Sequence, residues 1–159
     1  MTLTAVAEGW SSLYSNSWML RSCVSFAHIG GLVGAGGCAV MTDRATILAY
    51  RRRDDERRRH LEALGTAHRI VMGGLSVVAI SGVLLLLADL DAYLHAVAFW
   101  VKMAGVAALV INGGVLFAAW RKAVDGDSSA WLTLARASVV SLILWSATTL
   151  AGAVLPNAL

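Results

Sequence analysis

Four long apolar runs constrain this chain more than any other feature of its sequence. They cover residues 18–41, 70–88, 95–120 and 131–155. About 20 apolar residues suffice for an α-helix to cross the hydrocarbon of a bilayer. Inside lipid, a single run of chain satisfies its own backbone hydrogen bonds only as a helix. The sequence therefore predicts an all-α integral membrane protein, with one domain over residues 1–159.

The composition agrees with lipid as the surrounding medium. Hydrophobic residues make up 58% of the chain and charged residues 14%, whereas soluble domains carry about 25% charge. The sequence has no basic face on a soluble fold, so nucleic acid is not expected as a partner. It also lacks a Ser/His/Asp set, a phosphate loop and an HExxH motif, so nothing favours a hydrolase. The bilayer itself is the expected partner.

The charged residues between the runs predict the topology. Arginines crowd the loop at 49–60, which the positive-inside rule assigns to the cytoplasm. Arg121 and Lys122 fall on the same side, and the loop with Asp89 and Asp91 falls outside. Short connections make sequential helices antiparallel neighbours. We therefore expect an up-down-up-down four-helix bundle with both termini outside.

The amino-terminal residues lack the positive region of a cleavable signal peptide. Residues 1–16 are instead expected to form an interfacial segment, in which Trp10, Tyr14 and Trp18 anchor the chain at the headgroups. At the other end of the first span, Asp43 and Arg44 are expected to pair with each other or with the basic loop.

Lys102 is the residue least expected in such a bundle. It lies roughly 10–14 Å below the outer end of the third span, and a lysine deep in a span costs about 2.5–3.5 kcal/mol. No carboxylate lies at its depth. Unless the side chain snorkels to the surface, Lys102 requires either an anionic group from a ligand or a neutral amine.

His28 lies at a similar depth in the first span, roughly 15 Å below its outer end. It either bonds across helices or ligates a metal. Gly31, one turn away, removes bulk beside the imidazole, as a flat macrocycle next to a histidine ligand requires. Histidine is a common axial ligand of haem iron. Trp145 has a similar predicted depth, so His28, Lys102 and Trp145 are expected in one layer, with Ser81 near it.

His68 lies near the inner end of the second span, too deep to share one haem with His28. With His60 and Arg69 it would serve a second, inner site, or it is solvated at the interface.

Three short stretches resemble a group of small bacterial membrane proteins. They read His28-Ile-Gly-Gly-Leu-Val-Gly before Asp43-Arg44, Ile80-Ser-Gly-Val-Leu-Leu, and Phe99-Trp-Val-Lys102-Met before Asn112. The order is similar to that of the CopD copper-resistance domain and the HemJ-type protoporphyrinogen oxidases, over residues 17–120. The resemblance implies a bacterial inner-membrane location and a haem b at His28, with His28 and Lys102 as the family's characteristic pair.

These observations predict a b-type haem protein with a redox role, in electron transfer or porphyrinogen-type oxidation. His28 would be the metal ligand, Lys102 would meet a propionate or a substrate carboxylate, and Gly31 and Trp145 would shape the pocket. Its partner would be a redox protein or a porphyrin-like substrate. Two alternatives stay open. One is a haem-free transporter or CopD-like metal-handling protein, and the other is an accessory subunit of a larger complex.

Overall fold

A computed structural model describes residues 3–51 and 54–155 of the protein. Within those residues the regular structure is entirely helical, which confirms the all-α prediction. The helices are α1 (Leu3–Asn16), α2 (Trp18–Ala49), α3 (Asp54–Ala88), α4 (Leu90–His95), α5 (Val97–Val124) and α6 (Ala130–Val154).

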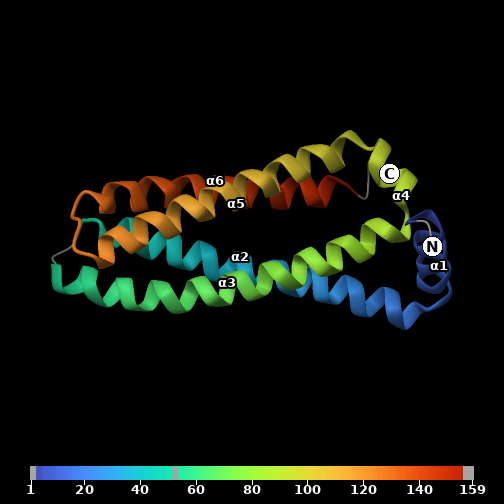
Figure 1. Ribbon diagram of the computed structural model, residues 1–159, viewed down its shortest axis with the longest axis horizontal. Helices are drawn as coiled ribbons and strands as arrows, with labels where there is room; N and C mark the ends of the chain where they lie inside the picture. The colour runs from blue at the N-terminus through green and yellow to red at the C-terminus, as the bar shows by residue number, and fades with distance from the viewer. Residues whose placement is uncertain (1–2, 52–53, 156–159) are drawn as a thin grey trace.

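The four long helices form an elongated bundle in which sequence neighbours run antiparallel (Figure 1). Helix α2 packs along both α3 and α6, and α5 packs along α6, whereas α3 and α5 touch over a short stretch. Both the α2–α3 and the α5–α6 connections lie at one end, which we name the arginine end (residues 50–60 and 121–129). Helices α1 and α4 lie at the opposite end, which we name the α1 end.

All four long helices are long and apolar enough to cross a membrane. Most of the apolar side chains in α3 and α5 face outward rather than into the bundle. Examples with more than half of their surface exposed are Ile80, Val110 and Ile111. An outward apolar surface around four helices of this length is what lipid requires. The chain is therefore a multi-pass membrane protein.

Small residues let the helix backbones approach closely. A Cβ atom at Gly74 of α3 would lie 2.7 Å from the Cβ of Ala35 in α2. At Gly36 of α2 it would lie 3.3 Å from the ring of Trp145 in α6. In lipid, such direct contact replaces the hydrophobic effect as the force that joins helices.

Apolar packing is divided into three clusters along the bundle. The first, at the arginine end, centres on Trp131 and Leu134. The second, in the middle, centres on Ala35 and Trp145. The third, at the α1 end, centres on Phe99 with Ala96 and Leu155. Along α5, Lys102 lies between the second and third clusters.

The first span extends further than predicted. It was expected to end at Met41 before Thr42, Asp43 and Arg44, but α2 continues to Ala49. Polar residues do not end a helix when their groups are satisfied within it. Here Thr42 donates a hydrogen bond of 2.7 Å to the carbonyl of Cys38, four residues earlier. Within the predicted loop at 49–60, residues 54–60 belong to α3, which begins at Asp54, whereas residues 52 and 53 lie outside the described part of the chain.

Short helices occupy the amino-terminal segment and the connection between the second and third spans, both at the α1 end. In α1, Trp10 Nε1 donates to the carbonyl of Leu84 at 2.8 Å, and Ser11 donates to that of Ala88 at 2.8 Å. These bonds hold α1 against the end of α3. In the connection that follows, Asp89 accepts from the backbone N–H of Ala92 and caps α4.

The close α2–α3 contact makes a specific prediction. Gly74→Ala should lower the free energy of unfolding by about 1–3 kcal/mol, because the new methyl group would overlap Ala35. The matched control is Gly73→Ala in the same turn, where a Cβ meets nothing within 4 Å. Thermal unfolding in detergent measures both variants. Equal midpoints for the two would contradict the packing described here.

Candidate functional site

A hydrogen bond between helices fixes the orientation of His28. Its Nδ1 lies 3.0 Å from the hydroxyl oxygen of Ser81 in α3. That hydroxyl lies 2.7 Å from the carbonyl oxygen of Val77 and therefore gives its hydrogen to Val77. Ser81 then accepts from His28, and the backbone of Val78 offers the ring a second acceptor, so both partners favour the tautomer with its hydrogen on Nδ1. Nε2 is left with a lone pair that can bind a metal or accept a hydrogen bond.

A glycine makes room for the imidazole. A Cβ atom at Gly82 would lie 3.3 Å from Cε1 of His28. Any larger residue at this position would press on the ring that Ser81 orients. The stretch Ile80-Ser81-Gly82, singled out in the sequence, thus serves His28 with its serine and its glycine.

Lys102 approaches the same region from α5. Its ammonium nitrogen lies 3.6 Å from the position that a Cβ at Gly152 of α6 would take. Its charge is close enough to act electrostatically on His28. Within the described ranges 3–51 and 54–155, no carboxylate pairs with Lys102. His28, Ser81, Gly82, Lys102 and Gly152 thus place one residue or more from each long helix around a shared region, which we name the His28–Lys102 layer.

Trp145 does not belong to this layer, so the prediction that it shares a level with His28 was wrong. Its ring packs on Gly36, which follows His28 by eight residues on α2, and therefore lies roughly 12 Å further along the helix. The prediction failed because counting residues from the approximate end of a span ignores where the neighbouring helix begins. Trp145 instead fills the middle apolar cluster beside Ala35 and Ala39.

Gly31 also serves helix packing. A Cβ atom at Gly31 would lie 2.9 Å from a methyl group of Val78 and 3.3 Å from the carbonyl oxygen of Gly74. The side of α2 that carries Gly31 is thus filled by α3, which leaves no room there for a macrocycle. A macrocycle beside His28 would therefore have to lie on the side of α5 and α6.

The histidines of the second span are not brought together. His68 stacks on Phe117 of α5, with ring centroids 5.1 Å apart. His60 lies two turns away, with Nε2 at 2.8 Å from the hydroxyl of Thr46 in α2. Arg69 is exposed. Among the described residues, no group of three or more His, Cys, Asp or Glu side chains could hold a metal ion.

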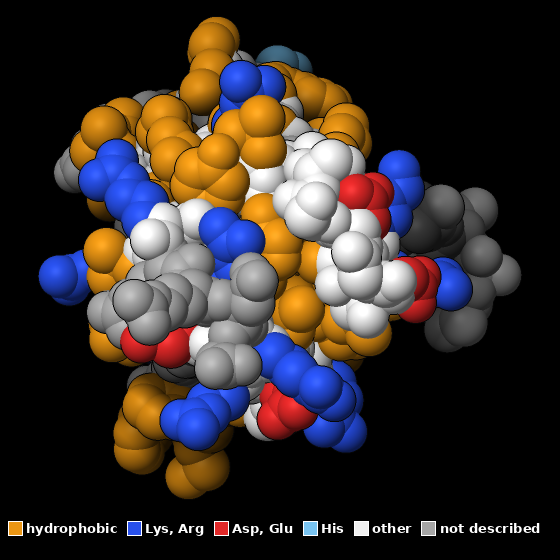
Figure 2. All heavy atoms as spheres, turned by 90° about the vertical axis from the view of Figure 1, so that its left-hand side faces the viewer, with side chains coloured by type: hydrophobic (Ala, Val, Ile, Leu, Met, Phe, Trp, Pro, Cys, Tyr) orange, Lys and Arg blue, Asp and Glu red, His pale blue; other side chains and the backbone are white. Residues whose placement is uncertain are grey.

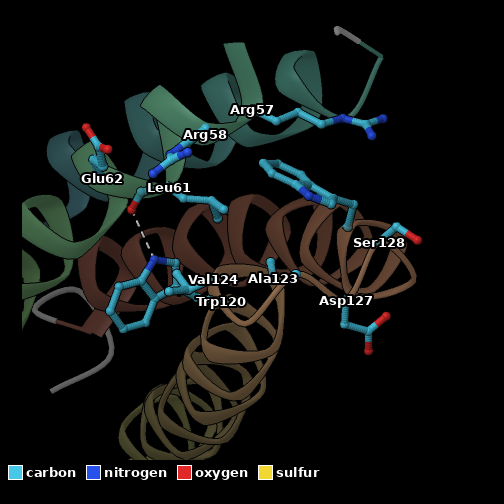
Figure 3. Close-up of a pocket in the computed structure, with 11 residues that line it drawn as sticks. Arg57, Arg58, Leu61, Glu62, Trp120, Ala123, Val124, Asp127 and Ser128 are labelled. Carbon is cyan, nitrogen blue, oxygen red and sulfur yellow. Dashed lines mark hydrogen bonds between the residues drawn. The ribbon is translucent and has the colours of Figure 1, made fainter. Parts of the chain in front are cut away.

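The arginine end carries a pocket of about 740 Å³ between α3, α5 and α6 (Figure 3). Lys and Arg side chains gather at this end with Asp and Glu among them (Figure 2). Arg57 donates to the carbonyl of Tyr50 at 2.7 Å and lies over the ring of Trp131, with 5.4 Å from Cζ to the centroid. It therefore helps to close the end of α2.

Acidic groups line the same pocket. Hydrogen bonds from the side chain and backbone of Ser129 hold the pKa of Asp127 below its usual range. Glu62 lies one turn from Arg58 on α3. The mixture of both charges disfavours a site for a simple anion.

Asp43 is the polar residue that sequence reasoning misplaced. It was expected to pair with Arg44 or with the basic loop. Arg44 is exposed, whereas Asp43 is buried and its carboxyl group faces Ser138 and Ser141 of α6. The available signal was the stripe of Ala35, Ala39 and Asp43 on α2, since three- and four-residue steps mark one face of a helix.

No family model, curated protein or solved structure matches the chain. The resemblance to CopD and HemJ-type proteins thus remains an expectation from short motifs.

The unpaired lysine gives a second prediction. Lys102→Met retains much of the side-chain length and removes the charge, so it should raise the free energy of unfolding by about 1–3 kcal/mol in ligand-free protein. Lys122→Met, at the exposed arginine end, serves as the control and should change little. Chemical unfolding in mixed micelles reports both. A destabilised Lys102→Met protein would show that an acidic partner compensates the lysine.

Proposed function

We propose that the chain is a haem b-binding membrane protein with a redox role, in which His28 would ligate the iron. The observation that carries the proposal is the bond from His28 Nδ1 to Ser81. Histidine ligands of metals usually donate their second N–H to a fixed acceptor, which sets the tautomer and raises the basicity of the ligating nitrogen. Nε2 of His28 has the lone pair that iron requires.

Lys102 supports the same ligand. The His28–Lys102 layer contains a cation without a carboxylate in the described part of the chain. Haem carries both a metal for the imidazole and propionates for an ammonium group, so one molecule would satisfy both residues. When bound, it would supply one-electron redox chemistry. The chain would orient the group through Ser81, neutralise a propionate through Lys102 and exclude water with its apolar clusters.

The fit is limited on one side of His28. Because Val78 and Gly74 fill the space beside Gly31, the macrocycle would lie toward α5 and α6. Helix α3 and helix α5 touch over a short stretch, and Lys102 stands on α5. A ligand between the two helix pairs would be in reach of both His28 and Lys102.

The arginines give the proposed orientation. By the positive-inside rule, the arginine end would face the cytoplasm of a bacterial inner membrane, and the His28–Lys102 layer would lie in the outer half. An electron partner or a porphyrin-like substrate would then meet the protein from the bilayer or from the outer side. The resemblance to HemJ-type proteins favours porphyrinogen-type oxidation.

A second candidate is a haem-free transporter. The observation that favours it is a series of buried oxygens without hydrogen-bond partners in the described residues, namely Asp43 Oδ2, Ser138 Oγ and Thr148 Oγ1. Polar residues inside membrane bundles commonly mark ion pathways. His28 and Lys102 would continue such a path toward the α1 end. A CopD-like metal-handling role would use the same histidine.

The haem proposal predicts a spectrum. Protein expressed with ample haem and purified in detergent should show a Soret band that shifts on reduction. His28→Ala should lose the band. His95→Ala is the matched control, because His95 is exposed and binds the carbonyl of Asp91 in its own helix. A colourless wild-type protein, or an equal band in both variants, would exclude haem ligation by His28.

Ser81 supplies an independent test of positioning. Ser81→Ala removes the hydroxyl acceptor of His28 Nδ1 and leaves only the backbone of Val78, so it should weaken haem affinity about 10-fold, toward the lower end of what loss of such partners does at metal sites. Reduction potential should shift as well, because the imidazole becomes a poorer donor. Ser76→Ala, one turn earlier on the exposed side of α3, is the control. An unchanged affinity and potential in Ser81→Ala would remove this role.

A further inference from the structure

The contact between α2 and α6 buries a carboxyl group without a counter-charge. Asp43 is 5% exposed, and the two serines that it faces, Ser138 and Ser141, are 0% and 4% exposed. Among the described residues, neither Asp43 Oδ2 nor Ser138 Oγ has a hydrogen-bond partner. The hydroxyl groups of Ser138 and Ser141 are directed at the carboxyl group of Asp43, so three oxygen-bearing side chains meet at this helix contact although Asp43 Oδ2 and Ser138 Oγ form no bond of regular geometry among the described residues.

Six other hydroxyl groups in the long helices behave differently from that of Ser138. They donate to the carbonyl oxygen four residues earlier, which satisfies the hydroxyl hydrogen inside its own helix. The examples are Ser22, Thr42, Thr46, Ser76, Ser81 and Ser146. Ser138 is fully buried and does not adopt this geometry. Its hydroxyl group is therefore directed outside its own helix, toward Asp43 of α2.

The charge of Asp43 also lacks compensation. A carboxyl group removed from water in a membrane bundle needs a positive partner, a metal ion or its own proton. Arg44, its neighbour in sequence, is exposed on another face of α2. No charged side chain acts appreciably on Asp43 within the ranges 3–51 and 54–155.

We propose that Asp43, Ser138 and Ser141 form a binding site for Na⁺ between α2 and α6. Carboxylate and hydroxyl oxygens are hard ligands, which hard cations prefer over the softer transition metals. A single carboxylate balances one positive charge, so a monovalent ion leaves the buried site neutral. Ala39 lies one turn before Asp43 on the same face of α2 and is buried as well, so the α2–α6 contact is closed at this level and suits a small ion better than K⁺.

The site is near the arginine end of α2. Asp43 precedes the last residue of the helix, Ala49, by six positions, or roughly 9 Å along the axis. An ion would reach it from that end. His28 lies fifteen positions before Asp43 on the same helix, so the two sites are separate, and the Na⁺ proposal does not rest on haem binding.

Thermal unfolding of the purified protein tests the proposal. Midpoints are measured in NaCl, KCl and choline chloride at equal ionic strength and fixed pH. We expect Na⁺ to raise the midpoint in a saturable way, because a ligand that binds the folded state alone stabilises it by mass action. Asp43→Asn should give the same midpoint in all three salts. Relative to the wild type in choline, it should be more stable, since it lacks the uncompensated charge.

Controls separate this site from other causes. Asp127→Asn removes an exposed carboxylate and should keep the full Na⁺ response, as should His28→Ala. Ser138→Ala should raise the half-saturating Na⁺ concentration about tenfold or more, and it serves as the test if Asp43→Asn does not fold. A wild-type midpoint that is equal in all three salts would overturn the proposal, even if the midpoint changed with pH. So would a Na⁺ response that survives in both Asp43→Asn and Ser138→Ala.

Discussion

Direct contact between helix backbones at small residues is the constraint on which this structure depends. In lipid, apolar side chains gain little by turning inward, so the bundle is held where α2 meets α3 at Ala35 and Gly74, and where α2 meets α6 at Gly36 and Trp145. These contacts leave little space for large polar side chains. The polar residues that do lie inside are therefore confined to particular levels of the bundle. The helix that faces each of them determines which partners it has.

Two such levels carry the chemistry proposed here, and they differ in what they lack. The His28–Lys102 layer has a positive charge and a lone pair but no acid among the described residues. The level of Asp43 has a carboxyl group on which no positive side chain of the described residues acts. Each level lacks a counter-charge, which a bound ligand of the opposite charge would supply. Their separation along α2 prevents the lysine and the aspartate from compensating each other.

The fold was predictable because length and apolarity alone require membrane-spanning helices, and Ser81 was rightly placed near the level of His28. Depth counting failed for Trp145, since the helices are staggered and the count began from an approximate end. The position of Asp43 could not be inferred from the end of the apolar run, because α2 continues as a helix past its polar residues to Ala49. Which face of a helix meets which neighbour depends on the packing of all four helices. Gly31 shows the same limit, because a glycine beside a histidine can serve packing as readily as a cofactor.

The helices pack unevenly, so the bundle consists of two helix pairs that are joined along one long contact. Helices α2 and α3 form one pair, and α5 and α6 form the other. The α2–α6 contact joins the two pairs, whereas α3 and α5 touch over a short stretch. A rotation of one pair about the α2–α6 contact would change distances most between α3 and α5. His28 and Lys102 belong to different pairs, so such a motion would separate them. Asp43 and Ser138, at the α2–α6 contact, would stay together. Opening of the bundle toward lipid would thus alter one site and spare the other.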